Sequence, residues 1–255
     1  MSLKVGIVGA AGYAGAELIR LVLGHPEFEL VAITSNADAG QPLSAVYPSF
    51  TGVSDLVFTT HDAPELKNCD AVFLAVPHTA AMARVPALLA AGVSCIALSA
   101  DYRLSDPATF EAWYAAEHTS PELLKSRAFG LPELFSQDLE TAASDHADGK
   151  PVLVACAGCY PTATSLAAAP AVRAGWVAQS GPVIVDAISG VTGAGKSCKP
   201  GGLWRGQASS HARNRADLGP NRSCRLYPAP GTAQARSALY GDDAAYAAGY
   251  RCLDP

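Results

Sequence analysis

The stretch Leu3-Lys-Val-Gly-Ile-Val-Gly-Ala-Ala-Gly-Tyr-Ala-Gly15 decides the fold. It predicts an apolar strand over residues 3–8, a glycine-rich turn and an amphipathic helix, and a second strand over 28–34 completes a βαβ unit. Glycines in such a turn let the backbone approach a pyrophosphate, which rests on the helix N-terminus. The pattern therefore predicts a dinucleotide site, with a purely structural turn as the alternative. Its candidate cofactor-binding residues are Gly9, Ala11, Gly12, Tyr13, Ala14 and Gly15.

The end of the second strand bears on which dinucleotide is bound. NAD sites usually carry an Asp or Glu there, about 20 residues past the glycines, to hold the ribose 2′-hydroxyl. This chain has Ser35 and Asn36 instead, whose hydroxyl and amide donors tolerate a 2′-phosphate. These two residues therefore predict NADP(H). Alternatively they are ordinary loop residues, and the nearby Asp38 leaves NAD open.

Strands continue to alternate with helices along the chain. Apolar strands are expected over 70–76 and 93–99, with a helix from about 79 to 91 between them. This alternation predicts a doubly wound parallel α/β sheet of the Rossmann type, with ligands at the carboxyl ends of its strands. A short edge segment over 129–134 and a polar linker over 141–150 follow. The residues at strand ends that could face cofactor or substrate, or serve the structure alone, are Pro77, His78 and Arg103.

Cys159 is the candidate nucleophile. An apolar strand over 151–155 precedes it, Gly158 allows a tight turn, and an Ala-rich helix is expected over 161–173. A helix N-terminus favours an anion, and the thiolate is the nucleophilic form of cysteine. The alternative is that Cys159 is a small buried hydrophobe. Cys156 is assigned to the turn that presents Cys159.

The rest of the chain predicts a second domain. Residues 1–150 are expected to form the NADP-binding domain and 151–255 the substrate domain. In the latter, a strand over 182–186 leads into a glycine-rich loop over 187–196, which suits a phosphate or carboxylate but could be a plain connection. The candidate substrate-binding residues are Arg103 and, in this loop, Ser189, Gly190 and Gly193.

The segment 198–255 differs in character. Seven of the twelve arginines fall in the last 55 residues, and no Glu occurs after Glu140. No hydrophobic period is sustained over 199–230, so we expect this segment to bury little and to be partly disordered.

Composition narrows the class of protein. At 255 residues, 49% hydrophobic and 16% charged, the chain predicts a soluble globular protein of one large or two ordinary domains. The net charge of −5 gives no support to a nucleic-acid partner. Neither a membrane span nor a signal peptide is visible. Seven irregularly spaced cysteines favour a reducing compartment, hence a cytoplasmic location, and no metal site is predicted.

Six motifs in order resemble the N-acetyl-gamma-glutamyl-phosphate reductase family of the semialdehyde dehydrogenase superfamily. The resemblance covers residues 3–198. The motifs are Gly9-x-x-Gly12-Tyr13-x-Gly15, Ala75-Val-Pro-His78, Leu98-Ser-Ala-Asp101-Tyr-Arg103-Leu, Gly130-Leu-Pro-Glu133, Gly158-Cys159-Tyr-Pro-Thr162 and Ser189-Gly-Val-Thr-Gly-Ala-Gly195. The resemblance implies an NADP-binding Rossmann domain, an α+β substrate domain, and Cys159 as the nucleophile. It also implies NADPH-dependent reduction of N-acetylglutamyl 5-phosphate to the 5-semialdehyde through a cysteine thioester, in arginine biosynthesis.

Two features depart from the family pattern. Cys156-Ala157 stands where the family has Asn-Pro. The family's His-rich motif, whose histidine is the general acid/base, is not recognisable after Cys198, where His211 is the only histidine. We therefore expect the C-terminal third to be atypical, truncated or out of frame. The family tends to form homo-oligomers, which this chain would share if that segment folds. The alternatives are a non-catalytic NADP-binding relic and an aspartate-semialdehyde-type dehydrogenase.

Overall fold

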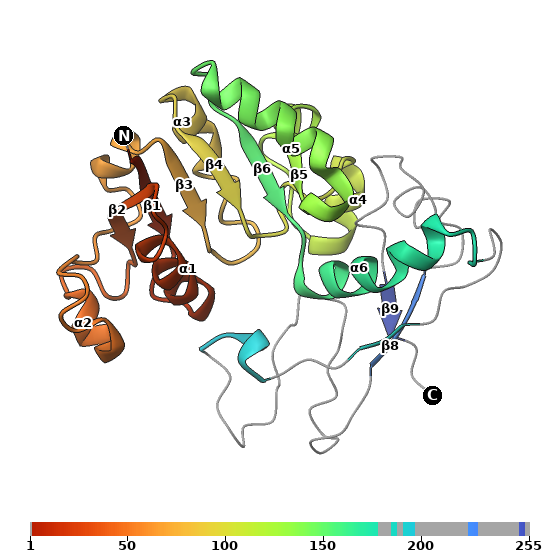
Figure 1. Cartoon of the computed structure of the whole chain (residues 1–255), viewed down its shortest axis with the longest axis horizontal. Helices are drawn as coiled ribbons and strands as arrows, with labels where there is room; N and C mark the ends of the chain where they lie inside the picture. Colours follow the sequence, from red (N-terminus) through yellow and green to blue (C-terminus); the bar gives the residue numbers. More distant parts are fainter. Residues whose placement is uncertain (1, 178–184, 188–190, 197–223, 229–249, 253–255) are drawn as a thin grey trace. The chain divides into compact units, whose positions relative to one another are not determined.

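Six parallel strands form the sheet of the first part of the chain (Figure 1). The computed structural model describes residues 2–177, 185–187, 191–196, 224–228 and 250–252. The strands of this sheet are β1 (Leu3–Val8), β2 (Phe28–Thr34), β3 (Ala71–Leu74), β4 (Ser94–Ala97), β5 (Ala128–Gly130) and β6 (Leu153–Cys156). Their order is β2-β1-β3-β4-β6-β5, and each neighbouring pair is parallel.

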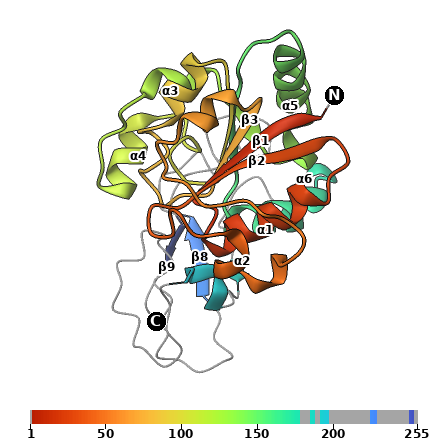
Figure 2. The same ribbon diagram turned by 90° about the vertical axis from the view of Figure 1, so that its left-hand side faces the viewer.

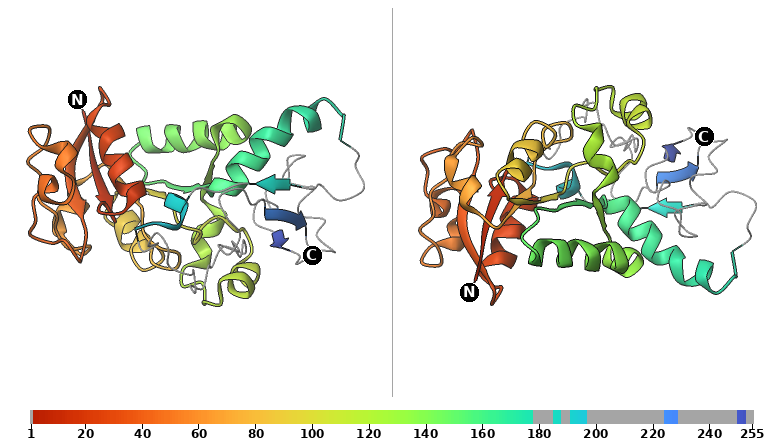
Figure 3. Two further views of the ribbon diagram at one scale, coloured as in Figure 1. Left: turned by 90° about the horizontal axis from the view of Figure 1, so that it is seen from below. Right: turned by 90° about the horizontal axis from the view of Figure 1, so that it is seen from above.

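Helices cover both faces of this sheet. The α-helices among the described residues are α1 (Tyr13–Leu23), α2 (Leu43–Val46), α3 (Val85–Ala90), α4 (Pro107–Tyr114), α5 (Pro132–Ala147) and α6 (Cys159–Arg173). Short 3-10 helices are η1 (Pro48–Phe50), η2 (Pro64–Asn68), η3 (Pro121–Lys125) and η4 (Val191–Ala194). Figures 2 and 3 show α1 and α5 over one face and α3 over the other. The predicted doubly wound Rossmann-type fold is confirmed.

Burial on both faces of the sheet explains why the sequence of β1 is a continuous apolar run. Val5, Ile7 and Val8 are fully buried, as expected for a parallel strand covered on both faces. Ile19 and Val22 of α1 are buried in the same core. Complete burial of each such side chain contributes about 1.5–3 kcal/mol before entropy is counted.

The strand order places a switch point at β1. β1 pairs with β2 on one side and with β3 on the other, so the chain reverses its direction of winding there. In doubly wound sheets, ligands bind in the crevice outside the carboxyl ends of the strands at such a point. The glycine turn follows β1 at this position.

The chain divides into two compact units. The first comprises Met1–Tyr102 and Thr119–Cys156, and the second comprises Arg103–His118 and Ala157–Pro255. The sequence analysis expected a boundary after residue 150, which lies before β6. In the structure β6 pairs with β4 and β5, so the first unit continues to Cys156. A buried strand belongs with the sheet that satisfies its backbone hydrogen bonds.

The predicted linker over 141–150 is wrong for most of its length. α5 continues to Ala147, with Ala142 buried and the His146 ring 2.9 Å from Ser94 Oγ through Nδ1. A surface helix needs only one apolar stripe, so a mostly polar composition does not exclude it.

The predicted helix over 79–91 is also shorter than expected. α3 begins at Val85, and Thr79 has a positive φ of 72°. The Asp101 carboxylate accepts hydrogen bonds from the Thr79, Ala81 and Met82 amides, and so holds this stretch as an irregular turn.

The second unit contains helices and an antiparallel sheet, in agreement with the predicted α+β class. The sheet consists of β7 (Val185–Ala187), β8 (Cys224–Pro228) and β9 (Tyr250–Cys252). β8 lies within residues 199–230, where the sequence showed no sustained hydrophobic period. A strand of five residues is too short to produce such a period over that stretch. The rest of the atypical segment, including His211, lies outside the described residues. Within the described part of the chain, no helix is long and apolar enough to cross a bilayer.

Candidate functional site

Three glycines shape the turn between β1 and α1, and the space available for a side chain differs at each of them. Gly9 has a φ of +80°, and a Cβ there would clash with the Ala75 carbonyl oxygen. A Cβ on Gly15 would clash with the Gly9 carbonyl oxygen. Gly12 has open space by contrast, since its Cβ would meet only Gly9 O, at 3.5 Å. A tight turn, close ligand approach and helix packing are the roles of the glycines in a dinucleotide fingerprint.

The N-terminus of α1 presents unpaired backbone donors. Gly12 is the N-cap with no side-chain cap, and the first intrahelical bond runs from Ala16 N to Gly12 O, at 2.8 Å. The first-turn amides without an intrahelical acceptor are those of Tyr13, Ala14 and Gly15. Tyr47 Oη donates to Ala11 O at 2.8 Å, which ties the turn to the following loop. The turn therefore suits a pyrophosphate.

The end of β2 is bonded directly to this turn. Thr34 is fully buried, and its carbonyl accepts hydrogen bonds from Gly9 N at 3.1 Å and from Ala10 N at 2.9 Å. Any group at the end of β2 is thus held at a defined place relative to the pyrophosphate turn.

Ser35 and Asn36 are less available than the sequence indicates. Ser35 is buried, and its hydroxyl donates to Asp38 Oδ2 at 2.7 Å. Asn36 Oδ1 accepts a hydrogen bond from His61 N at 2.9 Å, so the free donor of Asn36 is its Nδ2 group.

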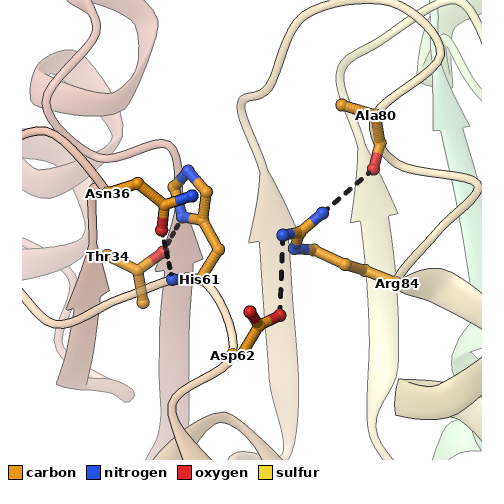
Figure 4. A network of polar contacts seen from close by, with 6 residues as sticks. All are labelled: Thr34, Asn36, His61, Asp62, Ala80 and Arg84. Atoms are coloured by element: carbon orange, nitrogen blue, oxygen red, sulfur yellow. Dashed lines mark hydrogen bonds and ion pairs between the residues drawn. The ribbon is translucent and has the colours of Figure 1, made fainter.

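The sequence reasoning missed two basic residues: His61 lies at the end of β2, and Arg84 lies farther along the sheet, beside Asp62 (Figure 4). His61 Nδ1 lies 2.7 Å from Thr34 Oγ1, and Arg84 forms a loose 3.6 Å ion pair with Asp62. Burial lowers the pKa of His61, the positive charge of Arg84 lowers it further, and Asp62 opposes both effects. Neither residue carries a local sequence signal, because His61 reaches the strand end, and Arg84 reaches Asp62, from other parts of the chain.

The predicted residues Pro77 and His78 lie in the turn after β3. His78 Nδ1 accepts a hydrogen bond from Ala100 N at 3.1 Å, so the neutral ring carries its proton on Nε2. Asp101 is fully buried and bonds to Thr79 N at 2.6 Å and Ala81 N at 2.8 Å. The turn at the carboxyl end of β3 is thus fixed by one buried carboxylate.

In the second unit, Cys159 is the first residue of α6. Gly158 is the N-cap in an extended conformation, without a side-chain cap, and the first intrahelical bond joins Thr162 N to Gly158 O at 2.9 Å. The helix begins two residues earlier than predicted, so Pro161 occupies its third position, where an amide would have no intrahelical partner. Cys159 is exposed, which argues against a buried hydrophobe.

Arg103 lies against the turn that presents Cys159. A Cβ placed on Gly158 would come within 2.9 Å of Arg103 Nη1, so glycine leaves room for the guanidinium. The cation and the start of α6 both favour an anion at this place. The structure therefore places one predicted residue, Arg103, against Gly158, which directly precedes another, Cys159. Of the predicted loop residues, Gly193 lies exposed in η4, whereas Ser189 and Gly190 lie outside the described residues.

We expect Cys159 to react with alkylating agents at least ~100-fold faster than Cys69 and Cys95. Burial raises the pKa of Cys69 to about 11 and that of Cys95 to about 12, so each is almost wholly thiol at pH 8. Brief labelling of the native chain with iodoacetamide at pH 8, followed by peptide mass spectrometry, measures the ratio. Labelling in urea should remove the difference. Equal rates in the native chain would contradict this assignment.

The switch-point glycine turn and the exposed cysteine at a helix start define a Rossmann-type dinucleotide-binding protein with a candidate thiol nucleophile. The chain belongs to the semialdehyde dehydrogenase family. The family model described as "Semialdehyde dehydrogenase, NAD binding domain" matches residues 4–142, and "Semialdehyde dehydrogenase, dimerisation domain" matches 159–212. The second match extends beyond Cys198. The first unit thus binds a nicotinamide cofactor.

Curated relatives confirm the resemblance to N-acetyl-gamma-glutamyl-phosphate reductases. The protein of that name from Herminiimonas arsenicoxydans is 47% identical over 77% of this chain and 54% of its own length. Those from Janthinobacterium sp. (strain Marseille) and Halorhodospira halophila are each 46% identical over 79% of this chain and 56% of their own length. The chain therefore spans about half the length of these relatives.

Solved structures share the fold. Aspartate semialdehyde dehydrogenase from Francisella tularensis aligns with a TM-score of 0.54 at 17% identity, over 77% of this chain and 47% of its own. The Candida albicans enzyme, solved with NADP, aligns with a TM-score of 0.50 at 19% identity, over 74% of this chain and 57% of its own. At such identities the likeness concerns the fold alone.

Proposed function

We propose that this chain catalyses NADPH-dependent reduction of N-acetyl-L-glutamyl 5-phosphate to N-acetyl-L-glutamate 5-semialdehyde, with Cys159 as the nucleophile. The observation that carries the proposal is the exposed Cys159 at the first position of α6, beside the Arg103 guanidinium. The similarity to reductases of this name supports the choice of substrate.

In the first step, the Cys159 thiolate attacks the acyl carbon of the substrate. A carbon–sulfur bond forms, the carbon–oxygen bond to phosphate breaks, and phosphate leaves with that electron pair, so an enzyme thioester remains. Arg103 is proposed to bind an anionic group of the substrate. The first-turn amides of α6 would stabilise the negative charge that develops on the acyl oxygen.

The bound cofactor supplies the hydride that reduces the thioester carbon. The resulting thiohemiacetal oxyanion collapses, the carbon–sulfur bond breaks, and Cys159 leaves as a thiolate with the aldehyde as product. The residues proposed to hold the cofactor are Gly9, Ala11, Gly12, Tyr13, Ala14, Gly15, Ser35, Asn36, Pro77 and His78. The open side of Gly12 and the uncapped start of α1 fit a pyrophosphate.

We also propose domain roles and a setting. The first unit, which includes β6, would form the cofactor domain, and the second unit would form the substrate domain, to which Ser189, Gly190 and Gly193 would contribute substrate contacts. The match to a dimerisation domain supports a homo-oligomer. A biosynthetic role on a small-molecule substrate supports a cytoplasmic location.

The reverse reaction tests this function. The purified chain is supplied with N-acetylglutamate 5-semialdehyde, NADP⁺ and phosphate, and absorbance of the reduced nicotinamide is followed. We expect turnover that requires phosphate. A parallel assay with aspartate 4-semialdehyde should show at least ~100-fold lower kcat/KM, since the site must reject a shorter chain that lacks the acetamido group. Preference for the aspartyl substrate, or cofactor binding without turnover on either aldehyde, would contradict the proposal.

A further inference from the structure

The end of β2 lacks the acidic residue that would hold a ribose 2′-hydroxyl. The basic side chain of His61 lies there instead, and Arg84 pairs with the next residue, Asp62 (Figure 4). In this fold the adenosine ribose is read at the end of β2, and in NADP-binding proteins a nearby arginine accommodates the 2′-phosphate. The residues that the sequence indicates for this task are partly engaged, because Ser35 donates to Asp38 and Asn36 Oδ1 is bonded to His61 N.

His61 is fixed at this place by two bonds. Its ring lies 2.7 Å from Thr34 Oγ1 through Nδ1, and its backbone amide donates to Asn36 at 2.9 Å. Thr34 is in turn bonded to Gly9 and Ala10 of the pyrophosphate turn. Thr34 therefore connects the half-buried His61 ring to that turn. The other ring nitrogen, Nε2, is not used in the contact with Thr34.

Arg84, at the start of α3, lies beside Asp62, the residue that follows His61. Its contacts are long, 3.6 Å to the exposed Asp62 carboxylate and 3.5 Å to the Ala80 carbonyl. Its Nε is buried and has no hydrogen-bond partner in the described part of the chain. A largely buried guanidinium with one unpaired donor and one loose, solvent-exposed counterion has unused capacity for an anion. Its charge also acts on His61.

We propose that Arg84 and His61, together with the Nδ2 group of Asn36, bind the 2′-phosphate of NADP(H) and set the preference for it over NAD(H). The proposal rests on the proposed function, since it concerns the cofactor of that reaction. A planar guanidinium can donate two parallel hydrogen bonds to the oxygens of the 2′-phosphate of NADP(H). The ribose 2′-hydroxyl of NAD(H) has one oxygen and no charge, so it cannot accept such a pair. Asp38, tied to Ser35, and Asp62, loosely paired with Arg84, are nearby acidic groups that oppose a phosphate.

The test measures the binding of NADPH and of NADH to the full chain in the absence of substrate. Nicotinamide fluorescence reports the binding. Arg84→Gln should weaken NADPH binding by on the order of 10- to 100-fold and NADH binding by less than about 2-fold. His61→Asn should weaken NADPH binding to a smaller extent. The matched control is Arg20→Gln, which removes the same charge from an exposed arginine on α1 that is also paired with a carboxylate. It should leave both affinities unchanged.

The outcomes separate this inference from the proposed function. If the native chain prefers NADPH but Arg84→Gln leaves that preference intact, the inference is wrong and the cofactor proposal stands. An equal loss of both cofactors in Arg84→Gln would show a structural role and also overturn the inference. Binding of neither cofactor by the native chain would overturn both proposals. Should Arg84→Gln fail to fold, Arg84→Lys keeps the charge but loses the planar fork, and it should still reduce the NADPH preference.

Discussion

Cys159→Ala should lower phosphate-dependent turnover of N-acetylglutamate 5-semialdehyde by on the order of 10⁴-fold or more. Cys159 is exposed at the first position of α6, and without its thiol neither the thiohemiacetal nor the thioester can form. Cofactor binding should be unchanged, because the glycine turn lies in the other unit. The measurement is kcat with NADP⁺ and phosphate, beside NADPH affinity by fluorescence.

The control for this experiment is Cys69→Ala. Cys69 is a buried thiol whose pKa is raised to about 11, so it cannot serve as a nucleophile at neutral pH, and its loss should leave turnover within about 2-fold. Retained turnover in Cys159→Ala would remove Cys159 from the mechanism. Loss of NADPH affinity in the same variant would instead indicate a disturbed fold.

Asp101→Ala should lower the free energy of unfolding by about 3 kcal/mol or more. Its buried carboxylate accepts bonds from the Thr79, Ala81 and Met82 amides, and each buried amide left without an acceptor costs about 1–3 kcal/mol. Urea unfolding followed by far-UV circular dichroism measures the loss. Hydrogen exchange should quicken at the three amides. NADPH affinity should fall as well, since the same turn carries Pro77 and His78.

The comparison variant is Asp106→Ala. Asp106 is an exposed N-cap of α4 whose side chain accepts from Ala108 N and Thr109 N, and its loss should cost only about 1 kcal/mol. Both variants remove one aspartate that bonds to backbone amides, and they differ in burial. Equal losses from the two would contradict a special role for the buried carboxylate.

The sequence was sufficient for features that depend on local physics. The apolar run of β1, the glycines after it, and the strand–glycine–cysteine–helix order before α6 each restrict the backbone within a few residues. A positive φ at Gly9 and an extended N-cap at Gly158 follow from such local restrictions. The Rossmann-type class and the choice of Cys159 could therefore be predicted without a structure.

Contacts between segments far apart in the sequence required the tertiary structure. His61 reaches the end of β2, Arg84 lies beside Asp62, and Asp101 shortens α3, only because parallel strands gather their carboxyl ends at one edge of the sheet. The same pairing assigns β6 to the first unit. The kind of chemistry was thus determined by local sequence, whereas the charges that surround the cofactor site were decided by folding, since electrostatic neighbours depend on distance in space and not along the chain.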